Sequence, residues 1–227
     1  MADALSVLAT ARKVCRICVD RHPDHIFNGS REYFDPPVAS YWAQWLGHEA
    51  PKLLIVGQDF GAIGYFRKHQ GRDEPNNSTN NNLRELLCIA GLRVGAPPTR
   101  DRDSPVFLTN SILCLKKGPM NAPIRDEWVR SCSHHHLVPL LAHLSPPIIV
   151  AMGKHGWMAL RLAFKLNSAP NLISKAAGGS WITRDGQTVF AVGHCGPLGR
   201  RNRPKDQQEA DWKKIGQAIA KLGRPVA

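Results

Sequence analysis

Short apolar runs mark the strands that this chain is expected to form. Residues 52–57 and 148–152 are almost wholly apolar, the first of them ends in a glycine, and residues 106–113 begin and end with apolar side chains. Runs of this length without polar alternation are typical of strands buried on both faces of a parallel sheet. Two further runs, 181–183 and 188–192, flank the turn dipeptide Asp185-Gly186 and predict a hairpin.

Segments with helical periodicity separate these strands. They are residues 1–14, 82–90, 126–144, 154–166 and 205–222. Strands that alternate with helices predict an α/β fold with helices on both faces of the sheet. We therefore expect a three-layer α/β/α architecture around a central, mainly parallel four-stranded sheet. Because no repeat or linker divides the chain, residues 1–227 are expected to form a single domain.

The net charge of the chain suggests a class of binding partner. Thirty Lys and Arg residues against eighteen Asp and Glu give a formal net charge of +12. Such an excess favours a polyanion, with nucleic acid first, although charge alone is equally compatible with a basic protein that binds none. No run of eighteen apolar residues and no secretory pattern occurs. We expect a cytoplasmic protein of a prokaryotic cytosol or nucleoid, monomeric and without a membrane partner.

Four of the six cysteines suggest a metal site, since cytosolic thiols stay reduced. Cys15 and Cys18 form a C-x2-C pair, and Cys114 and Cys132 follow far downstream. Four thiolates suit either an iron-sulfur cubane or tetrahedral zinc, and their spacing does not distinguish the two. Of the remaining cysteines, Cys88 is expected in the core, and Cys195 is expected to face the nucleic acid.

Three polar motifs follow predicted strands. They read Gly-Gln-Asp-Phe-Gly at 57–61, Leu-Thr-Asn-Ser-Ile-Leu-Cys at 108–114 and His-Cys-Gly-Pro-Leu-Gly at 194–199. In this order and spacing they resemble the active-site motifs of the uracil-DNA glycosylase superfamily, and residues 148–153 resemble the segment that precedes its fourth motif. The four cysteines are similar to those of the iron-sulfur branch, family 4. The resemblance thus favours a [4Fe-4S] cluster of structural role over zinc.

The resemblance implies a DNA glycosylase that flips out a pyrimidine nucleotide and hydrolyses its N-glycosidic bond, leaving an abasic site. Such a reaction needs negative charge beside C1′ and a hydrogen-bond donor at the departing base. Asp59 would activate water and stabilise the cationic sugar, and His194 would bind the O2 atom of the base. Taken singly, Asp59 could instead be a helix N-cap and His194 a packed turn residue.

The resemblance also implies contacts to the base and to DNA. Asn110 would read the Watson–Crick edge, and Gln58, Phe60 and Gly61 would complete the base site. Leu198 would fill the gap in the base stack. Arg200 and Arg201 are expected to bind phosphates. The basic surface could extend through Arg67, Lys68, Lys116 and Lys117. Residues 134–136, three histidines, are expected at the surface, because adjacent helical residues cannot chelate one ion. No lysine occupies a motif position, which favours a monofunctional, purely hydrolytic enzyme.

The first motif leaves the substrate open. Gln58-Asp59 is similar to the pair of the family 1 enzymes, in which a tyrosine two residues after the aspartate excludes C5-substituted bases, whereas Gly61 stands here. The phenylalanine that stacks on uracil in family 4 aligns near Asn76, so Phe60, Tyr65 or Phe66 could stack instead. The alternatives are uracil excision in repair, excision of hydroxymethylated or glucosylated cytosine from phage DNA in antiviral defence, or a catalytically silent iron-sulfur DNA-binding protein.

Overall fold

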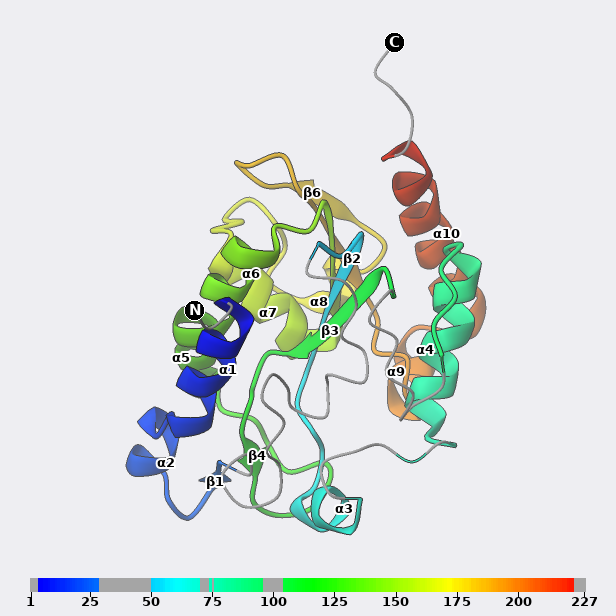
Figure 1. Ribbon diagram of the computed structural model, residues 1–227. Helices are drawn as coiled ribbons and strands as arrows, with labels where there is room; N and C mark the ends of the chain where they lie inside the picture. Colours follow the sequence, from blue (N-terminus) through cyan, green and yellow to red (C-terminus); the bar gives the residue numbers. More distant parts are fainter. Residues whose placement is uncertain (1–3, 29–49, 70–73, 75, 96–103, 223–227) are drawn as a thin grey trace.

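The computed structural model describes residues 4–28, 50–69, 74, 76–95 and 104–222 (Figure 1). A five-stranded sheet of order β3-β2-β5-β7-β6 lies at its centre. Four strands run parallel, namely β3 (Val106–Asn110), β2 (Leu53–Gly57), β5 (Ile148–Met152) and β7 (Thr188–Val192). The predicted hairpin adds β6 (Ser180–Ile182) as an antiparallel edge strand. The predicted fold class is confirmed, with this fifth strand added to the four that are parallel.

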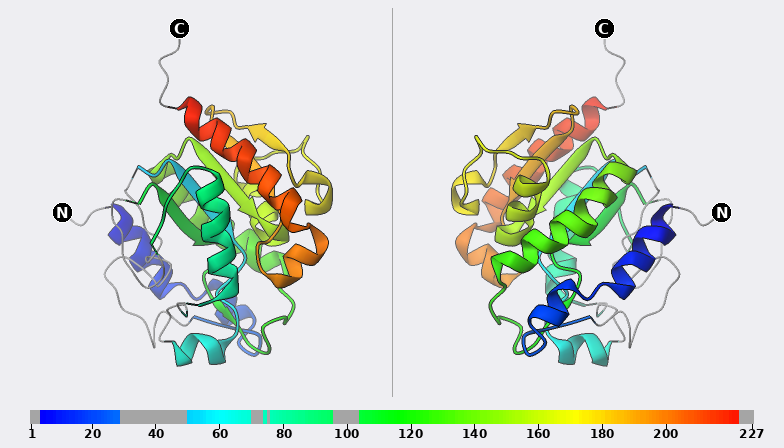
Figure 2. Two further views of the ribbon diagram at one scale, coloured as in Figure 1. Left: turned by 90° about the vertical axis from the view of Figure 1, so that its right-hand side faces the viewer. Right: turned by 90° about the vertical axis from the view of Figure 1, so that its left-hand side faces the viewer.

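Helices cover both faces of the sheet, as Figure 2 shows. One face packs against α4 (Ser78–Ile89) and α10 (Lys205–Lys221), through Leu53 and Ile55 of β2. The opposite face, with Leu54 and Val56, packs against the remaining long helices, which are α1 (Ala4–Val14), α5 (Asp126–Cys132), α6 (Val138–Leu144) and α7 (Gly153–Ala163). All four of these β2 side chains are 0% exposed. Burial of each stabilises the fold by about 1.5–3 kcal/mol.

The helix predicted over residues 126–144 is interrupted in its middle. α5 ends at Cys132, a π-helical segment spans Ser133–Leu137, and α6 begins at Val138. Pro139 lies in the first turn of α6 and has no N–H to donate, which favours a wider turn before it. His134 and His135 are exposed, as predicted. His136 is partly buried, and desolvation together with the nearby Arg12 lowers its pKa to about 4.

Small elements at the lower end of Figure 1 connect the N-terminal segment to the sheet. They are α2 (Ile17–Arg21), β1 (Ile26–Phe27), α3 (Ile63–Lys68) and β4 (Leu115–Lys116). β1 and β4 pair antiparallel. Two short helices, α8 (Ile173–Ala176) and α9 (Pro197–Asn202), precede and follow the β6–β7 hairpin along the chain. Within the described ranges, no helix has the length and apolar character needed to cross a membrane.

Candidate active site

The three motifs meet at the C-terminal edge of the parallel strands, where open α/β sheets bind their ligands. Asn110 ends β3 and lies beside Gly57, the last residue of β2. A Cβ atom on Gly57 would lie 2.6 Å from Oδ1 of Asn110, so only glycine lets the amide of Asn110 approach the end of β2. Asp59 follows β2 by two residues, and His194 follows β7 by two residues.

Asp59 is buried and held at both carboxylate oxygens. Its Oδ1 accepts a hydrogen bond from the backbone N–H of Gly61 at 3.2 Å, and its Oδ2 forms an ion pair with Nζ of Lys116. The Asp59 and Lys116 side chains are only 8% and 3% exposed. The N-cap of α3 is Ala62, so Asp59 does not cap this helix. The expectation that Lys116 extends the basic surface is wrong, because β4 directs its side chain inward onto Asp59.

His194 is held as a neutral imidazole. The backbone N–H of Gly196 donates to its Nδ1 at 3.0 Å, so the proton of the neutral ring lies on Nε2. Burial lowers the pKa of His194, while the negative charge of Asp59 acts in the opposite direction. Nε2–H is therefore available as a hydrogen-bond donor at neutral pH. Asp59 and His194 are separated by 134 residues in the sequence, but they follow the ends of β2 and β7, which both pair in parallel with β5.

A second histidine, which the sequence analysis missed, orients Gln58. His155 Nδ1 donates to Oε1 of Gln58 at 2.8 Å, since a carbonyl oxygen can only accept. The backbone oxygen of Gln58 accepts from Ser111 Oγ at 2.8 Å and from the N–H of Ile112 at 3.1 Å. Burial lowers the pKa of His155, which keeps its ring neutral. Its position at the start of α7, directly after β5, was the sequence feature that could have revealed it.

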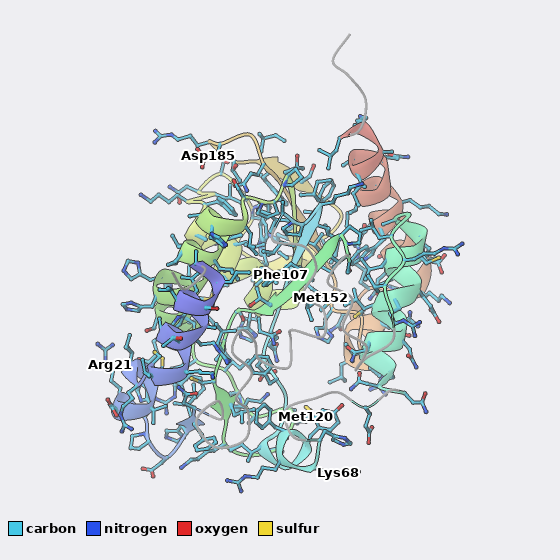
Figure 3. All side chains as sticks on the ribbon, in the orientation of Figure 1. Arg21, Lys68, Phe107, Met120, Met152 and Asp185 are labelled. Atoms are coloured by element: carbon cyan, nitrogen blue, oxygen red, sulfur yellow. The ribbon has the colours of Figure 1, made fainter. Side chains whose placement is uncertain are left out.

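The space beside Gly61 is covered by a residue from a distant loop. Gly61 has φ of +79°, and a Cβ atom there would lie 2.7 Å from Sδ of Met120. Met120 follows β4 and is 54% exposed; Figure 3 shows it near the end of the molecule that carries Lys68 of α3. The flexible side chain of Met120 thus occupies the space that a side chain at position 61 would fill.

The aromatic residues near the first motif differ in their availability. Phe60 is partly buried and packs on the core. Phe66 is 2% exposed within that core, so the suggestion that it stacks on a base is wrong. The Tyr65 hydroxyl accepts hydrogen bonds from the N–H of Glu74 and the amide of Asn77, which also caps α4. Asn76 is exposed.

The third motif presents an exposed leucine and an exposed arginine on α9. Leu198 is 67% exposed, and none of the ion pairs within the described part of the chain involves the exposed Arg201. Arg200 lies 3.5 Å from Oε2 of Glu85, which ties it to α4. Arg203 instead forms a bidentate pair with Asp211 at 2.5 and 2.6 Å and is structural.

Four cysteines from three segments converge beside the sheet. Cys15 joins α1 to α2, Cys18 lies in α2, Cys114 precedes β4 and Cys132 ends α5. Desolvation raises the pKa of Cys114 and raises that of Cys132 to about 12, and charge interactions with the other thiols add to both shifts. The backbone N–H of Leu113 donates to Sγ of Cys132 at 3.5 Å. Thiols that oppose one another's ionisation suit a shared cationic centre.

The surroundings of these thiols suit a site that holds thiolates. Among the described residues, no three His, Cys, Asp or Glu side chains are grouped closely enough for one metal ion. Arg12, 3% exposed, lowers the pKa of Cys114 and Cys132, and a buried cation suits an anionic thiolate site.

The two remaining cysteines lie in other surroundings than the sequence predicts. Cys88 is exposed rather than in the core. Cys195 is 0% exposed, with Sγ 3.4 Å from the Thr79 carbonyl oxygen and 3.5 Å from Met152 Sδ, so it does not face a ligand. Its small side chain fills a gap between α4 and β5 directly after His194.

The parallel sheet, with its polar residues at one edge, defines an α/β enzyme of the class that binds its substrate across the ends of the strands. A comparison with family models matches residues 45–216 to the uracil DNA glycosylase superfamily, and the chain belongs to this family. The chain is also 27% identical over 180 residues to the type-4 uracil-DNA glycosylase of Archaeoglobus fulgidus, covering 78% of this chain and 81% of that protein. The predicted superfamily is confirmed, the chain is similar to a member of the predicted type-4 branch, and the protein is a DNA glycosylase.

Proposed function

We propose that the protein is a monofunctional glycosylase that removes uracil from DNA by hydrolysis and leaves an abasic site. The observation that carries this proposal is that Asp59, with its buried side chain, and His194 follow the ends of β2 and β7 at the same edge of the sheet. Membership of the superfamily and similarity to a protein named as a type-4 uracil-DNA glycosylase support uracil as the base. The chain acts as a monomeric single domain on a nucleotide flipped out of DNA.

Asp59 acts on the sugar. Cleavage of the N-glycosidic bond leaves positive charge on the sugar ring, and a fixed carboxylate beside C1′ stabilises it. The same carboxylate orients the attacking water, whose proton it accepts as the new C1′–O bond forms. The contacts from Gly61 and Lys116 hold the carboxylate in place before the substrate arrives, so little reorganisation accompanies the reaction.

His194 and Asn110 act on the base. As the bond breaks, negative charge develops on the uracil, and Nε2–H of His194 donates to its O2 atom. A neutral donor suits this role, because the ring remains neutral after the base leaves. The Asn110 amide pairs with N3–H and O4 of uracil, and Gln58, fixed by His155, together with Phe60, encloses the ring.

The remaining surfaces hold the DNA and the fold. Leu198 enters the stack in place of the flipped nucleotide, and Arg200 and Arg201 bind the flanking phosphates. Cys15, Cys18, Cys114 and Cys132 hold a [4Fe-4S] cluster, which when bound crosslinks the N-terminal segment to the segment after β3 and to α5.

The test is release of uracil by the purified protein. Oligonucleotides with one uracil, as single strands and opposite guanine or adenine, are incubated with the protein and cleaved with alkali at any abasic site. We expect cleavage at the uracil and none in matched strands that carry thymine. Intact uracil strands in every context would contradict the proposal.

Excision of C5-modified cytosine is the second candidate, and the contact between Gly61 and Met120 favours it. An exposed, unbranched thioether can move aside for a bulky C5 group, which a rigid side chain rooted at position 61 could not do. The same assay with hydroxymethylated and glucosylated cytosine tests it, and intact strands would reject it. Met120→Ala should speed release of the glucosylated base, and Met120→Trp should slow it.

A further inference from the structure

Lys116 is the most deeply buried amine in direct contact with the proposed catalytic centre. Its side chain is 3% exposed, and its Nζ pairs with Oδ2 of Asp59, itself 8% exposed. A lysine is almost never buried so fully without a partner, because transfer of its charge from water is costly. The pair is therefore a specific feature of the site, and the three motifs of the sequence do not include it.

The backbone around Lys116 is fixed from both sides. β4 pairs it with Ile26 of β1, an isolated bridge joins it to Ala62, and the next N–H, of Lys117, donates to the His25 carbonyl oxygen at 2.8 Å. Ala62 itself lies three residues after Asp59. Lys116 thus approaches Asp59 from the antiparallel pair of β1 and β4, and β4 begins directly after Cys114.

We propose that Lys116 is a positioning residue that fixes the rotamer and charge of Asp59 for attack on C1′. This inference rests on the proposed glycosylase function. With Oδ2 held by Lys116 and Oδ1 by Gly61, the carboxylate keeps one orientation, and each oxygen retains a lone pair that can accept a further hydrogen bond. Because β1 supports β4, the cysteine-bearing N-terminal segment contributes to this orientation through Lys116.

Lys116 has a different role from a lyase nucleophile. Attack of an amine on C1′ requires a free lone pair, whereas the amine of Lys116 is engaged in an ion pair with the group that would have to take its proton. An enzyme built this way releases the base and leaves the abasic strand unbroken. We therefore expect the paired lysine to act on Asp59 rather than on the sugar.

The test is a double-mutant cycle on Lys116 and Asp59. Lys116→Met, Asp59→Asn and the double variant are compared with wild type by single-turnover base release and by affinity for a duplex with an abasic-site analogue. Lys52→Met is the control, since this exposed lysine precedes β2 at the opposite edge of the sheet. Because Lys116→Met leaves Asp59 buried without its cation, urea unfolding of all five proteins is measured in parallel.

We expect Lys116→Met to slow base release at least tenfold with DNA affinity within twofold, and to have no further effect once Asp59 is asparagine. Lys116→Arg should recover part of the rate, and Lys52→Met should match wild type. Additive effects of the two substitutions would overturn the proposal, as would a borohydride-trapped DNA adduct that depends on Lys116. If wild type releases no base from any substrate, the proposed function fails instead. In that case the Lys116–Asp59 ion pair is still tested by stability. The double variant should unfold at a urea concentration at least as high as that for Lys116→Met.

Discussion

The backbone N–H of Gly196 donates a hydrogen bond to Nδ1 of His194 at 3.0 Å and thereby fixes which ring nitrogen carries the proton. A Cβ atom on Gly196 would lie 3.0 Å from Cε1 and Nδ1 of His194 and 2.9 Å from Oγ1 of Thr79. The missing side chain therefore allows a close contact that sets the orientation of the imidazole.

Gly196→Ala is expected to displace the imidazole and lower kcat. A shift of the order of 1 Å in a reacting group can cost about 100-fold in rate. Gly64→Ala is the matched control, because Gly64 is exposed in α3 and a Cβ atom there would meet nothing within 4 Å. Single-turnover kinetics should show a loss of at least about tenfold for Gly196→Ala and wild-type rates for Gly64→Ala. Equal rates for the two variants would exclude the orienting role.

The pH dependence of base release should follow the lowered pKa of His194. A ring whose pKa lies below the usual value of about 6.5 stays neutral to lower pH. Protonation of Nδ1 would then break the bond from Gly196. We expect the rate to hold constant from pH 8 through 6.5 and to fall only at lower pH. A midpoint at or above 6.5 in wild type, on a substrate whose DNA affinity is unchanged, would contradict this assignment.

His194→Asn should lower kcat by about 100- to 1,000-fold, the usual effect of removing one donor to a developing negative charge. The fall in rate at acid pH that arises from protonation of His194 should also be absent from this variant. The measurement is the full pH–rate profile of the variant beside that of wild type. If the rate of the variant falls over the same pH range as that of wild type, the titration of another group causes the fall.

The lowered pKa of His136 makes the stability of the fold depend on pH. Its pKa of about 4 lies below the unfolded value, so its contribution is complete above pH 6.5 and is lost as the pH falls towards 4. The shift corresponds to about 3 kcal/mol at most. We expect His136→Gln to flatten the fall in unfolding free energy between pH 6.5 and 4, measured by urea titration. An identical slope in wild type and variant would show that other groups produce it.

Leu198→Ala should weaken catalysis without loss of stability, because Leu198 is 67% exposed and packs on little of the protein. Loss of the side chain that fills the stack is expected to lower kcat/KM about tenfold, since unstacking costs a few kcal/mol. Ile182→Ala is a matched control with the same 67% exposure in β6. Both variants should melt like wild type, and only Leu198→Ala should lose activity on duplex DNA.

Replacement of a cluster cysteine should remove both colour and stability. Cys132→Ser is expected to abolish the visible absorption of the purified protein and to lower the unfolding free energy by about 3 kcal/mol or more, because metal binding and folding are coupled. Cys88→Ser, at an exposed position, should change neither. Iron and sulfide analysis of the wild-type protein distinguishes the cluster from zinc. Zinc without iron would refute the cluster.

Much of the site could be predicted because it lies where apolar runs end. Strands buried on both faces are visible as continuous apolar segments, and the polar residues that follow them, Asp59, Asn110 and His194, must meet at one edge. The fold class and the placement of these three residues therefore follow from local pattern and the topology of parallel sheets.

The features that were missed depend on tertiary packing. A lysine near the end of a strand motif usually reaches solvent, and only the pairing of β4 with β1 turns Lys116 inward. His155 acquires its role from Gln58, nearly one hundred residues earlier. Cys88 and Leu87 are neighbours near the end of α4. Leu87 is buried and Cys88 is exposed, and helical periodicity alone does not decide which of the two faces the sheet.

The most direct test of the account is the rate of base release by Asp59→Asn. Asparagine keeps the shape of the side chain and removes the negative charge beside C1′. We expect a single-turnover rate at least about 1,000-fold below wild type, with affinity for substrate DNA unchanged or slightly tighter. Asp185→Asn, in the exposed β6–β7 turn labelled in Figure 3, should behave like wild type. A wild-type rate for Asp59→Asn would contradict the central claim that Asp59 and His194 act together on one extruded nucleotide.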